Sequence, residues 1–269
     1  MTATDPSAAM IRDVEFAYDR SGDGPDLVWG HGLTSSMASE DDLGLVDWSA
    51  IRRRARVLRY DARGHGQSGS TADPAGYSWR SLALDQLALT DHLGIASYVA
   101  GGASMGCATA LHAAVLAPDR IRALVLVIPP TAWATRAEQT GVYRVMADLV
   151  EAGDHETLLA GAAAGPPPDP FVDDPRWKAR FPELLSTCEP TRLARVFRGA
   201  ATADLPSPDQ IAAIEVPALI IAWTGDPGHP VQTAARLQEL MPHAELRLVT
   251  TAAGLAGWTD RLRAFLDVV

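Results

Sequence analysis

The chain has 269 residues, 47% of them hydrophobic, which fits a globular protein with a sizeable core. Its net charge of −10 argues against nucleic acid or an anionic membrane as a partner. Cys107 and Cys188 make no disulfide framework, the N-terminus lacks signal-peptide features, and no apolar run approaches the roughly 20 residues of a membrane helix. We therefore expect a cytoplasmic protein that does not bind a membrane.

Strands are expected to alternate with helices along the first half of the chain. The apolar patterns predict strands at 10–18, 26–29, 56–60, 98–100 and 121–128, and helices at 45–54 and 78–92. The run at 121–128 is almost continuously apolar, which is typical of a parallel strand that is buried on both faces.

The alternation pauses between about 131 and 208. Helical patterns at 138–151 and 190–200 are separated by the turn-rich run 165–170, and the whole stretch is too long for a bare loop. It is therefore predicted to be a helical cap, 131–208, inserted into a core made of 1–130 and 209–269.

The strand–helix alternation then resumes. It continues with strands at 216–223 and 245–249, a helix ending near Met241, and a last helix that contains Trp258 and Leu266. This order predicts a doubly wound α/β fold with a mostly parallel sheet.

One serine stands at the junction of a predicted strand and helix. The run Gly101-Gly102-Ala103-Ser104-Met105-Gly106 contains the Gly-x-Ser-x-Gly spacing of a nucleophile elbow. Such a turn exposes the serine hydroxyl and presses the residues two before and two after it together, where glycine has no Cβ to clash.

Four landmarks occur together in a fixed order. They are Gly30-His31-Gly32, Asp61-x-Arg63-Gly64-His65-Gly66-x-Ser68, the elbow around Ser104, and Thr224-Gly225-Asp226. On these motifs the chain resembles the α/β-hydrolase superfamily. The resemblance implies an eight-stranded, mostly parallel sheet, a cap after the sixth strand and no cofactor.

The resemblance also implies roles for individual residues. Ser104 would be the nucleophile and Asp226 the acid of a catalytic triad. The backbone N–H groups of Leu33 and Met105 would form the oxyanion hole. Of the other motif residues, His31 and His65 are each either structural or part of the site, and Glu40-Asp41-Asp42 is either a solvated acidic loop or a cation site.

The histidine of the family pattern is missing. The family places it after the last strand, but the loop 250–258 has Leu255 after Gly254, and no histidine follows His243. The candidate substitute is His229, three residues after Asp226, in a loop that Pro227-Gly228 could turn back toward Ser104. The alternative is that His229 only caps the helix after Pro230.

Three functions follow from these residues. The first is a serine hydrolase that attacks a small, largely apolar ester, lactone or related acyl compound through a Ser104 acyl-enzyme, with His229 as base. The second is a non-hydrolytic lyase or cyclase that uses the same pocket without a full triad. The third is a catalytically inactive ligand-binding protein.

The predicted cap supplies an apolar lining for the substrate pocket. We expect His31, Trp133 and Tyr143 in this pocket, with further apolar surface from Met146, Phe171, Trp177 and Phe181, although several of these side chains must form the core of the cap. No arginine clamp, phosphate loop or metal-ligand spacing is recognisable, so a small-molecule substrate without cofactor or metal is expected. The oligomeric state stays open, with a homodimer as one option.

Overall fold

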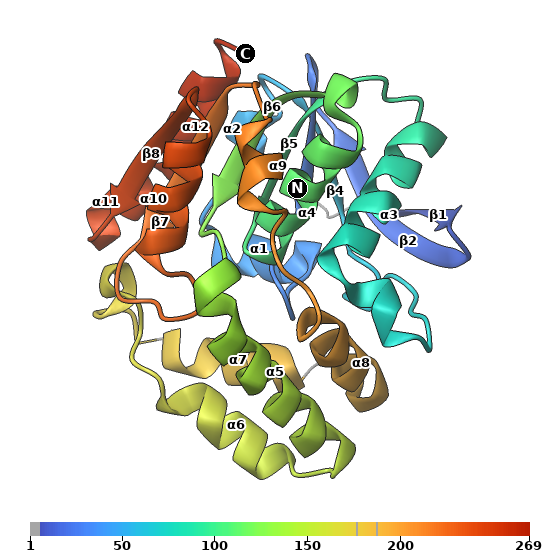
Figure 1. The fold of residues 1–269 in the computed structure, drawn as a ribbon, viewed down its shortest axis with the longest axis vertical. Coiled ribbons are helices and arrows are strands. Elements are labelled where there is room, and N and C mark those ends of the chain that lie inside the picture. Colours follow the sequence, from blue (N-terminus) through green and yellow to red (C-terminus); the bar gives the residue numbers. More distant parts are fainter. Residues whose placement is uncertain (1–5, 176, 187) are drawn as a thin grey trace.

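A mixed β-sheet runs through the middle of the molecule (Figure 1). The computed structural model describes residues 6–175, 177–186 and 188–269, and over these residues the sheet has eight strands in the order β1-β2-β4-β3-β5-β6-β7-β8. The strands are β1 Ser7–Ile11, β2 Val14–Ser21, β3 Asp26–Gly30, β4 Arg56–Tyr60, β5 Tyr98–Ala103, β6 Ile121–Val127, β7 Ala218–Trp223 and β8 Ala244–Val249. From β4 to β8 all neighbours are parallel, which confirms the predicted fold class.

The first predicted strand is wrong, because the chain forms a hairpin there. β1 and β2 pair antiparallel, with Ile11 opposite Val14. Arg12 and Asp13 between them have φ angles of 46° and 64°, so both adopt the left-handed conformation that a tight hairpin turn requires. Neither residue is a glycine or an asparagine, and the usual sequence signal for such a turn is therefore absent.

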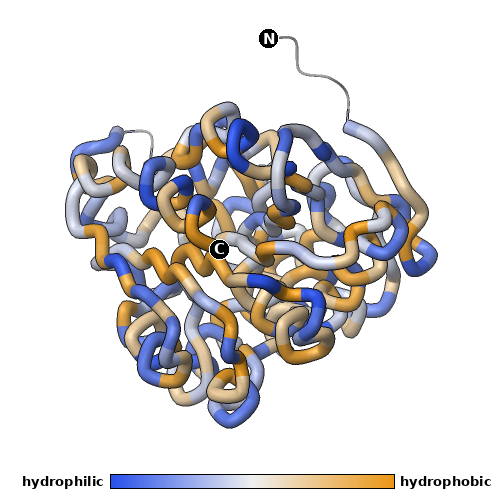
Figure 2. Tube along the Cα trace, turned by 90° about the horizontal axis from the view of Figure 1, so that it is seen from above, coloured by the Kyte–Doolittle hydropathy of each residue, from blue (hydrophilic) through white to orange (hydrophobic). Residues whose placement is uncertain are grey.

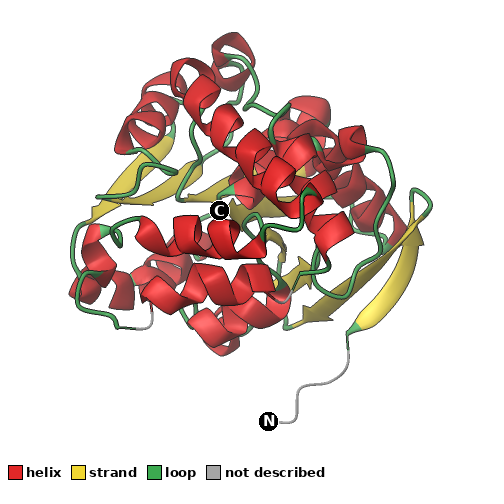
Figure 3. Cartoon of the chain, turned by 90° about the horizontal axis from the view of Figure 1, so that it is seen from below, coloured by secondary structure: helices red, strands yellow, loops and turns green. Residues whose placement is uncertain are grey.

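Alternating strand residues build a separate core on each face of the sheet. Val28, Leu58 and Leu124 belong to one buried cluster, whereas Leu27, Val57 and Val125, one residue away in each strand, belong to the other. Figure 3 shows helices on both sides of the sheet, and Figure 2 shows hydrophobic segments concentrated in the interior. Both faces of the parallel strands are thus removed from water.

The covering helices divide between the two faces. The first cluster receives residues from α3 Trp79–His92, α4 Met105–Leu116, α9 Pro208–Ala212 and α10 Val231–Leu240, and the second from α2 Trp48–Ile51 and α12 Trp258–Leu266. The other short elements are α1 Met37–Leu43, α11 Ala252–Ala256, and the 3-10 turns Pro74–Tyr77, Pro118–Arg120, Trp133–Thr135 and Asp169–Phe171.

The helix predicted at 45–54 is shorter in the structure, where α2 begins at Trp48 because the Asp47 carboxylate accepts from Ala50 N–H. The preceding helix α1, which Gly44 ends with a φ of 65°, was not predicted. The helices predicted at 78–92 and 190–200 agree with α3 and with α8 Pro190–Ala200.

A layer of helices covers one edge of the sheet. The segment between β6 and β7 contains α5 Arg136–Glu151, α6 His155–Ala164, α7 Trp177–Ser186 and α8, which lie below the sheet in Figure 1. Leu158, Leu185 and Phe197 belong to a third buried cluster inside this layer. The helices thus lie where the inserted cap is predicted. Across the described ranges, no helix has both the length and the apolar character to cross a bilayer.

Candidate functional site

Ser104 lies in a strained turn between β5 and α4. Its φ of 53° and ψ of −108° lie outside the ordinary regions for a residue with a side chain. A Cβ on Gly106 would lie 1.9 Å from the carbonyl oxygen of Gly30, and one on Gly102 would lie 2.5 Å from the same atom. The two glycines are therefore required for this close approach, and the predicted strand–turn–helix is confirmed.

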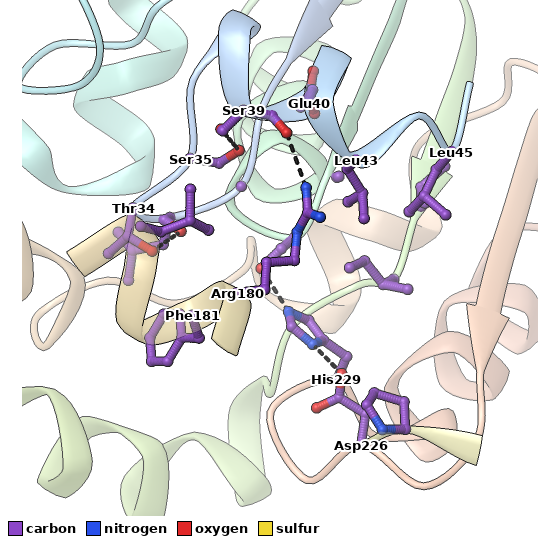
Figure 4. Close-up of a pocket in the computed structure, with 18 of the residues that line it drawn as sticks. Thr34, Ser35, Ser39, Glu40, Leu43, Leu45, Arg180, Phe181, Asp226 and His229 are labelled. Atoms are coloured by element: carbon purple, nitrogen blue, oxygen red, sulfur yellow. Dashed lines mark hydrogen bonds and ion pairs between the residues drawn. The ribbon is translucent and has the colours of Figure 1, made fainter. Parts of the chain in front are cut away.

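His229 contacts the Ser104 hydroxyl. Its Nε2 atom is 2.7 Å from Ser104 Oγ, and its Nδ1 atom is 2.8 Å from Asp226 Oδ2 (Figure 4 shows His229 beside Asp226). Because a carboxylate only accepts hydrogen bonds, Nδ1 carries the proton and Nε2 is left to accept the proton of the serine. The structure therefore brings Ser104, His229 and Asp226 into one hydrogen-bonded chain.

Asp226 is held in its ionised form. Burial opposes its ionisation, but the neighbouring His229, the hydrogen bond from that ring, and further bonds from Trp223 Nε1 and Gly228 N–H together lower its pKa to about 2. A carboxylate with this set of donors has a fixed orientation, and it fixes the tautomer of the imidazole.

A folded-back loop brings His229 to the serine. Gly225 begins the turn with a φ of 79°, His229 N–H donates to the Asp226 carbonyl at 3.2 Å, and Thr131 N–H donates to the Gly228 carbonyl at 3.1 Å. The alternative that His229 only caps α10 is wrong, because Pro230 holds the cap position and no side chain caps that helix.

The loop after β8 does not supply a basic group. It forms α11, and Leu255 packs against the core cluster that contains Trp223 and Trp258. Leu255 is not among the residues that line the cavity at Ser104, although Trp223 and Trp258 of the same cluster are.

The glycine loop after β3 lies against the serine. A Cβ on Gly32 would be 3.7 Å from Ser104 Cβ, and Leu33 lines the cavity beside Ser104. Met105 follows the serine as the first residue of α4. Leu33 and Met105 thus flank Ser104, as the predicted oxyanion hole requires, and their catalytic role stays a prediction.

A cavity of about 380 Å³ opens above Ser104, a volume that suits a small molecule. One wall comes from the segment 29–48 (Figure 4). The other comes from α6, α7 and the carboxyl ends of β5, β6 and β7. Most of the lining is apolar, including the predicted Trp177 and Phe181.

Five side chains predicted in the pocket do not line it, and that prediction is corrected: Met146 and Phe171 pack in apolar clusters, and His31, Trp133 and Tyr143 have other contacts. The His31 ring accepts from Ala62 N–H, lies against the Gly32 carbonyl and is 1% exposed, with its pKa lowered to about 4 by burial. Its role is therefore structural. Trp133 Nε1 donates to the Pro206 carbonyl, and Tyr143 stacks on Phe197 in the core of the helical layer.

His65, in the turn after β4, is also buried. Its Nδ1 lies 3.0 Å from the Arg63 carbonyl, and its ring packs edge-on against His31. The structure thus gives His65 local contacts, and His229 is the histidine bonded to Ser104.

Two further ionisable side chains among the described residues line the cavity, and the sequence indicated only one of them. Glu40, considered above as part of an acidic loop, lies in the cavity wall, and both its carboxylate oxygens are 3.1 Å from Trp29 Nε1. Burial raises the Glu40 pKa to about 7. Arg180, on α7, lines the opposite wall and donates to the Ser39 carbonyl at 3.0 Å. A single arginine in a polar helix gives no sequence signal for such a position.

The described residues contain no group of three histidine, cysteine, aspartate or glutamate side chains that could hold a metal ion. Cys107, which lies one turn after the serine, is buried and donates to the carbonyls of Gly102 and Val127. Burial raises the pKa of this thiol, so it is a packing residue.

Comparisons with known proteins show the family of this chain. A model of the alpha/beta hydrolase fold matches residues 27–148. The chain is 30% identical over 258 residues to a protein named "Putative carbamate hydrolase RutD" from Pseudomonas savastanoi pv. phaseolicola. The matched region covers 91% of this chain and 93% of that protein. It is 26% identical over 241 residues to 3-oxoadipate enol-lactonase 2 of Acinetobacter baylyi, covering 88% and 86% of the two chains.

Solved structures share the fold along almost the whole chain. A hydrolase from Pseudomonas aeruginosa PA01 superposes with a TM-score of 0.79 at 27% identity, covering 99% of this chain and 97% of the other. The enol-lactonase from Burkholderia xenovorans LB400 gives a TM-score of 0.78 at 23% identity, covering 97% of both chains.

Proposed function

The chain belongs to the α/β-hydrolase fold family and is a hydrolase, and on that premise we propose that it cleaves a small, largely apolar ester, lactone or related acyl compound through an acyl-enzyme on Ser104. The observation that carries the proposal is the 2.7 Å contact between His229 Nε2 and Ser104 Oγ. This contact gives the serine a base although the loop after β8 contains none.

In the first half of the proposed reaction, His229 Nε2 takes the hydroxyl proton while Ser104 Oγ attacks the acyl carbon. The negative charge that develops on the carbonyl oxygen is stabilised by the N–H groups of Leu33 and Met105. The protonated imidazole then gives its proton to the leaving oxygen, and the acyl–oxygen bond breaks.

In the second half, a water molecule takes the place of the leaving group beside His229 Nε2. His229 removes a proton from the water, the hydroxide attacks the acyl-serine, and the proton returns to Ser104 as the acid leaves. Asp226 stays ionised throughout and holds Nδ1–H toward itself, which stabilises the imidazolium in both halves.

The contact between His229 and Ser104 argues against the two alternative functions, a lyase or cyclase and an inactive binding protein. The motive for a lyase or cyclase is the empty histidine position, and the contact between Ser104 and His229 removes it. An inactive binding protein would keep the pocket but would have no need of this contact. A carbamate is itself an acyl compound with the same tetrahedral chemistry, so relatives named for carbamate and lactone hydrolysis support the same reaction class.

The test is covalent labelling by a fluorophosphonate, with the modified peptide identified by mass spectrometry. We expect one adduct on Ser104, no adduct in Ser104→Ala, and esterase activity reduced by roughly 10⁴-fold in His229→Ala. His243→Ala is the matched control, because His243 is exposed on the surface and should leave the rate unchanged. A folded protein that resists labelling, or full activity without His229, contradicts the proposal.

A further inference from the structure

Thr34 has a backbone conformation that its side chain disfavours, and it lies beside Ser104. Its φ angle is 62°, which is a genuine outlier for a residue with a branched Cβ. The residue is buried and lines the Ser104 cavity (Figure 4). Strain of this kind persists only where the surrounding contacts hold it, and it is concentrated at functional sites.

We propose that Thr34 is a positioning residue, whose hydroxyl holds the turn that directs the Leu33 N–H group toward the oxyanion of the reaction. This inference rests on the proposed hydrolysis at Ser104. It adds to that reaction a side chain that acts through Leu33 and takes no part in the proton transfers.

A tight turn between β3 and α1 contains this residue. Ser35 N–H donates to the carbonyl of Gly32 at 3.1 Å and closes the four residues of the turn. Its third residue has a positive φ, as in a type II turn, where glycine or asparagine is usual. Thr34 takes that place, and its Oγ1 donates to the carbonyl of Leu33 at 2.6 Å. The threonine thus supplies a bond that a glycine lacks.

The peptide groups on both sides of Leu33 are held by hydrogen bonds. The Gly32 carbonyl and the Leu33 N–H belong to one planar peptide group, so a bond to that carbonyl also fixes the direction of that N–H. His31 Nε2 accepts from Ala62 N–H, which leaves the ring proton on Nδ1. This Nδ1 donates to the Gly32 carbonyl at 2.7 Å, in addition to the bond that closes the turn. The next peptide group contains the Leu33 carbonyl and is held by Thr34 Oγ1.

The Leu33 N–H group is left for a ligand. Over the residues that the structure describes, it donates no hydrogen bond to another part of the chain. A Cβ on Gly32 would lie 3.7 Å from Ser104 Cβ, so this peptide group lies close to the serine. A donor whose direction is fixed in advance needs no rearrangement when negative charge develops in front of it, and this is the source of its effect on the rate.

Removal of the hydroxyl should loosen the turn. The Leu33–Thr34 peptide group is then free to rotate, and the φ of residue 34 can return to the negative values that a branched residue prefers. A donor that is less firmly directed should cost less than the roughly 10²- to 10³-fold in kcat that follows the loss of a whole oxyanion-hole donor. KM should change little, because the neutral carbonyl of the bound substrate depends less on this donor than the oxyanion does.

The experiment measures kcat and KM for 4-nitrophenyl butyrate. We expect kcat to fall roughly tenfold in Thr34→Val, which keeps the branched shape but loses the hydroxyl, with KM within about twofold of the wild type. Thr34→Ser keeps the hydroxyl and should retain most of the rate. Thr34→Ala takes the place of Thr34→Val if the valine variant does not fold. Thr202→Val is the matched control, because the exposed Thr202 donates to the Gly199 carbonyl at 2.9 Å, and it should leave both constants unchanged.

An alkyl trifluoromethyl ketone gives a second readout. Its adduct with Ser104 carries an oxyanion where the reaction forms one, so its inhibition constant should rise in Thr34→Val by the factor by which kcat falls. Three results would each overturn the inference: an unchanged kcat in Thr34→Val, a loss confined to KM, or a Thr34→Ser variant as slow as Thr34→Val.

Hydrogen exchange separates this inference from the proposed hydrolysis. A wild type that cleaves no ester would contradict hydrolysis at Ser104, but the turn can still be read from the Ser35 amide, which its bond to Gly32 protects from exchange. Faster exchange of this amide in Thr34→Val than in the wild type and in Thr34→Ser supports the role of the hydroxyl. Equal exchange in all three proteins would overturn it.

Discussion

The indole of Trp223 donates a hydrogen bond of 2.7 Å to Asp226 Oδ2, the same oxygen that accepts from the His229 ring. Trp223 is the last residue of β7, and its ring lies among Phe171, Trp177 and Trp258, stacked on the last of these at 5.7 Å. A rigid aromatic group at the end of β7 therefore fixes the orientation of the acid that orients the base.

Replacing Trp223 by phenylalanine removes this donor but keeps an aromatic ring. We expect kcat to fall about tenfold, the equivalent of one hydrogen bond to a charged group of roughly 1.5 kcal/mol. The Asp226 pKa should rise, because one of the hydrogen bonds that lower it is lost. Rates on one ester check the loss of kcat. Trp177→Phe, which loses the same indole from the same group of rings, should lose little, and equal losses in the two variants would contradict the positioning role.

A histidine placed at the usual family position should not restore a base. In His229→Ala/Leu255→His the new ring stands on α11, where Leu255 packs against the apolar cluster and not in the cavity. We expect the double variant to be no more active than His229→Ala, and to unfold at a lower temperature because a polar ring enters that packing. Esterase rates and thermal unfolding of both variants test this. If the double variant were more than about tenfold more active than His229→Ala, which corresponds to about 1.4 kcal/mol, the loop after β8 would have to reach Ser104.

Features fixed by local backbone geometry could be predicted from the sequence. The elbow at Ser104 follows from two glycines at a set spacing, and both meet the carbonyl of Gly30. For His229, the Pro227-Gly228 turn and the absence of a histidine after His243 indicate one of two possible positions, and the other was a cap on the following helix. The glycine spacing of the elbow acts over a few residues, so the sequence contains it.

Features that depend on which face of a helix packs against its neighbours could not be predicted. Tyr143 faces Phe197 because α5 packs against α8, and Arg180 faces the cavity, where it donates to the Ser39 carbonyl of α1. These choices come from contacts between segments far apart in the chain. The hairpin at Arg12 and Asp13 was missed for a different reason, because residues other than glycine and asparagine adopt its left-handed turn.

Gly106 should tolerate no side chain. A Cβ there would lie 1.9 Å from the Gly30 carbonyl oxygen, so β3 and α4 would have to separate. We expect Gly106→Ala to be insoluble or to lose several kcal/mol of the roughly 5–15 kcal/mol that stabilises such a domain. Gly141→Ala is the matched control, since Gly141 is exposed within α5 with open space around it, and it should gain up to about 1 kcal/mol. Urea unfolding of both measures the difference, and a stable, active Gly106→Ala would contradict the close approach of the strands and helix.

Glu40 should make the protein less stable as the pH rises. Burial raises its pKa from 4.5 to about 7, against the opposing effects of the Trp29 hydrogen bond and Arg59, and with smaller support from Asp41 and Asp61. Between these two values the folded protein keeps a proton that the unfolded chain releases, so the free energy of unfolding falls as the pH increases.

The substitution Glu40→Gln removes this titration and keeps an oxygen to accept from Trp29. We expect similar stability of variant and wild type near pH 4.5, and a variant that is more stable at pH 8 by at most about 3 kcal/mol, the linkage value for a shift of this size. Urea unfolding at several pH values between these limits measures the difference. Asp42→Asn, which changes an exposed carboxylate of the same helix, should leave the pH dependence as in the wild type. Stability curves for Glu40→Gln that run parallel to the wild type would mean that Glu40 ionises in the folded protein as it does in water.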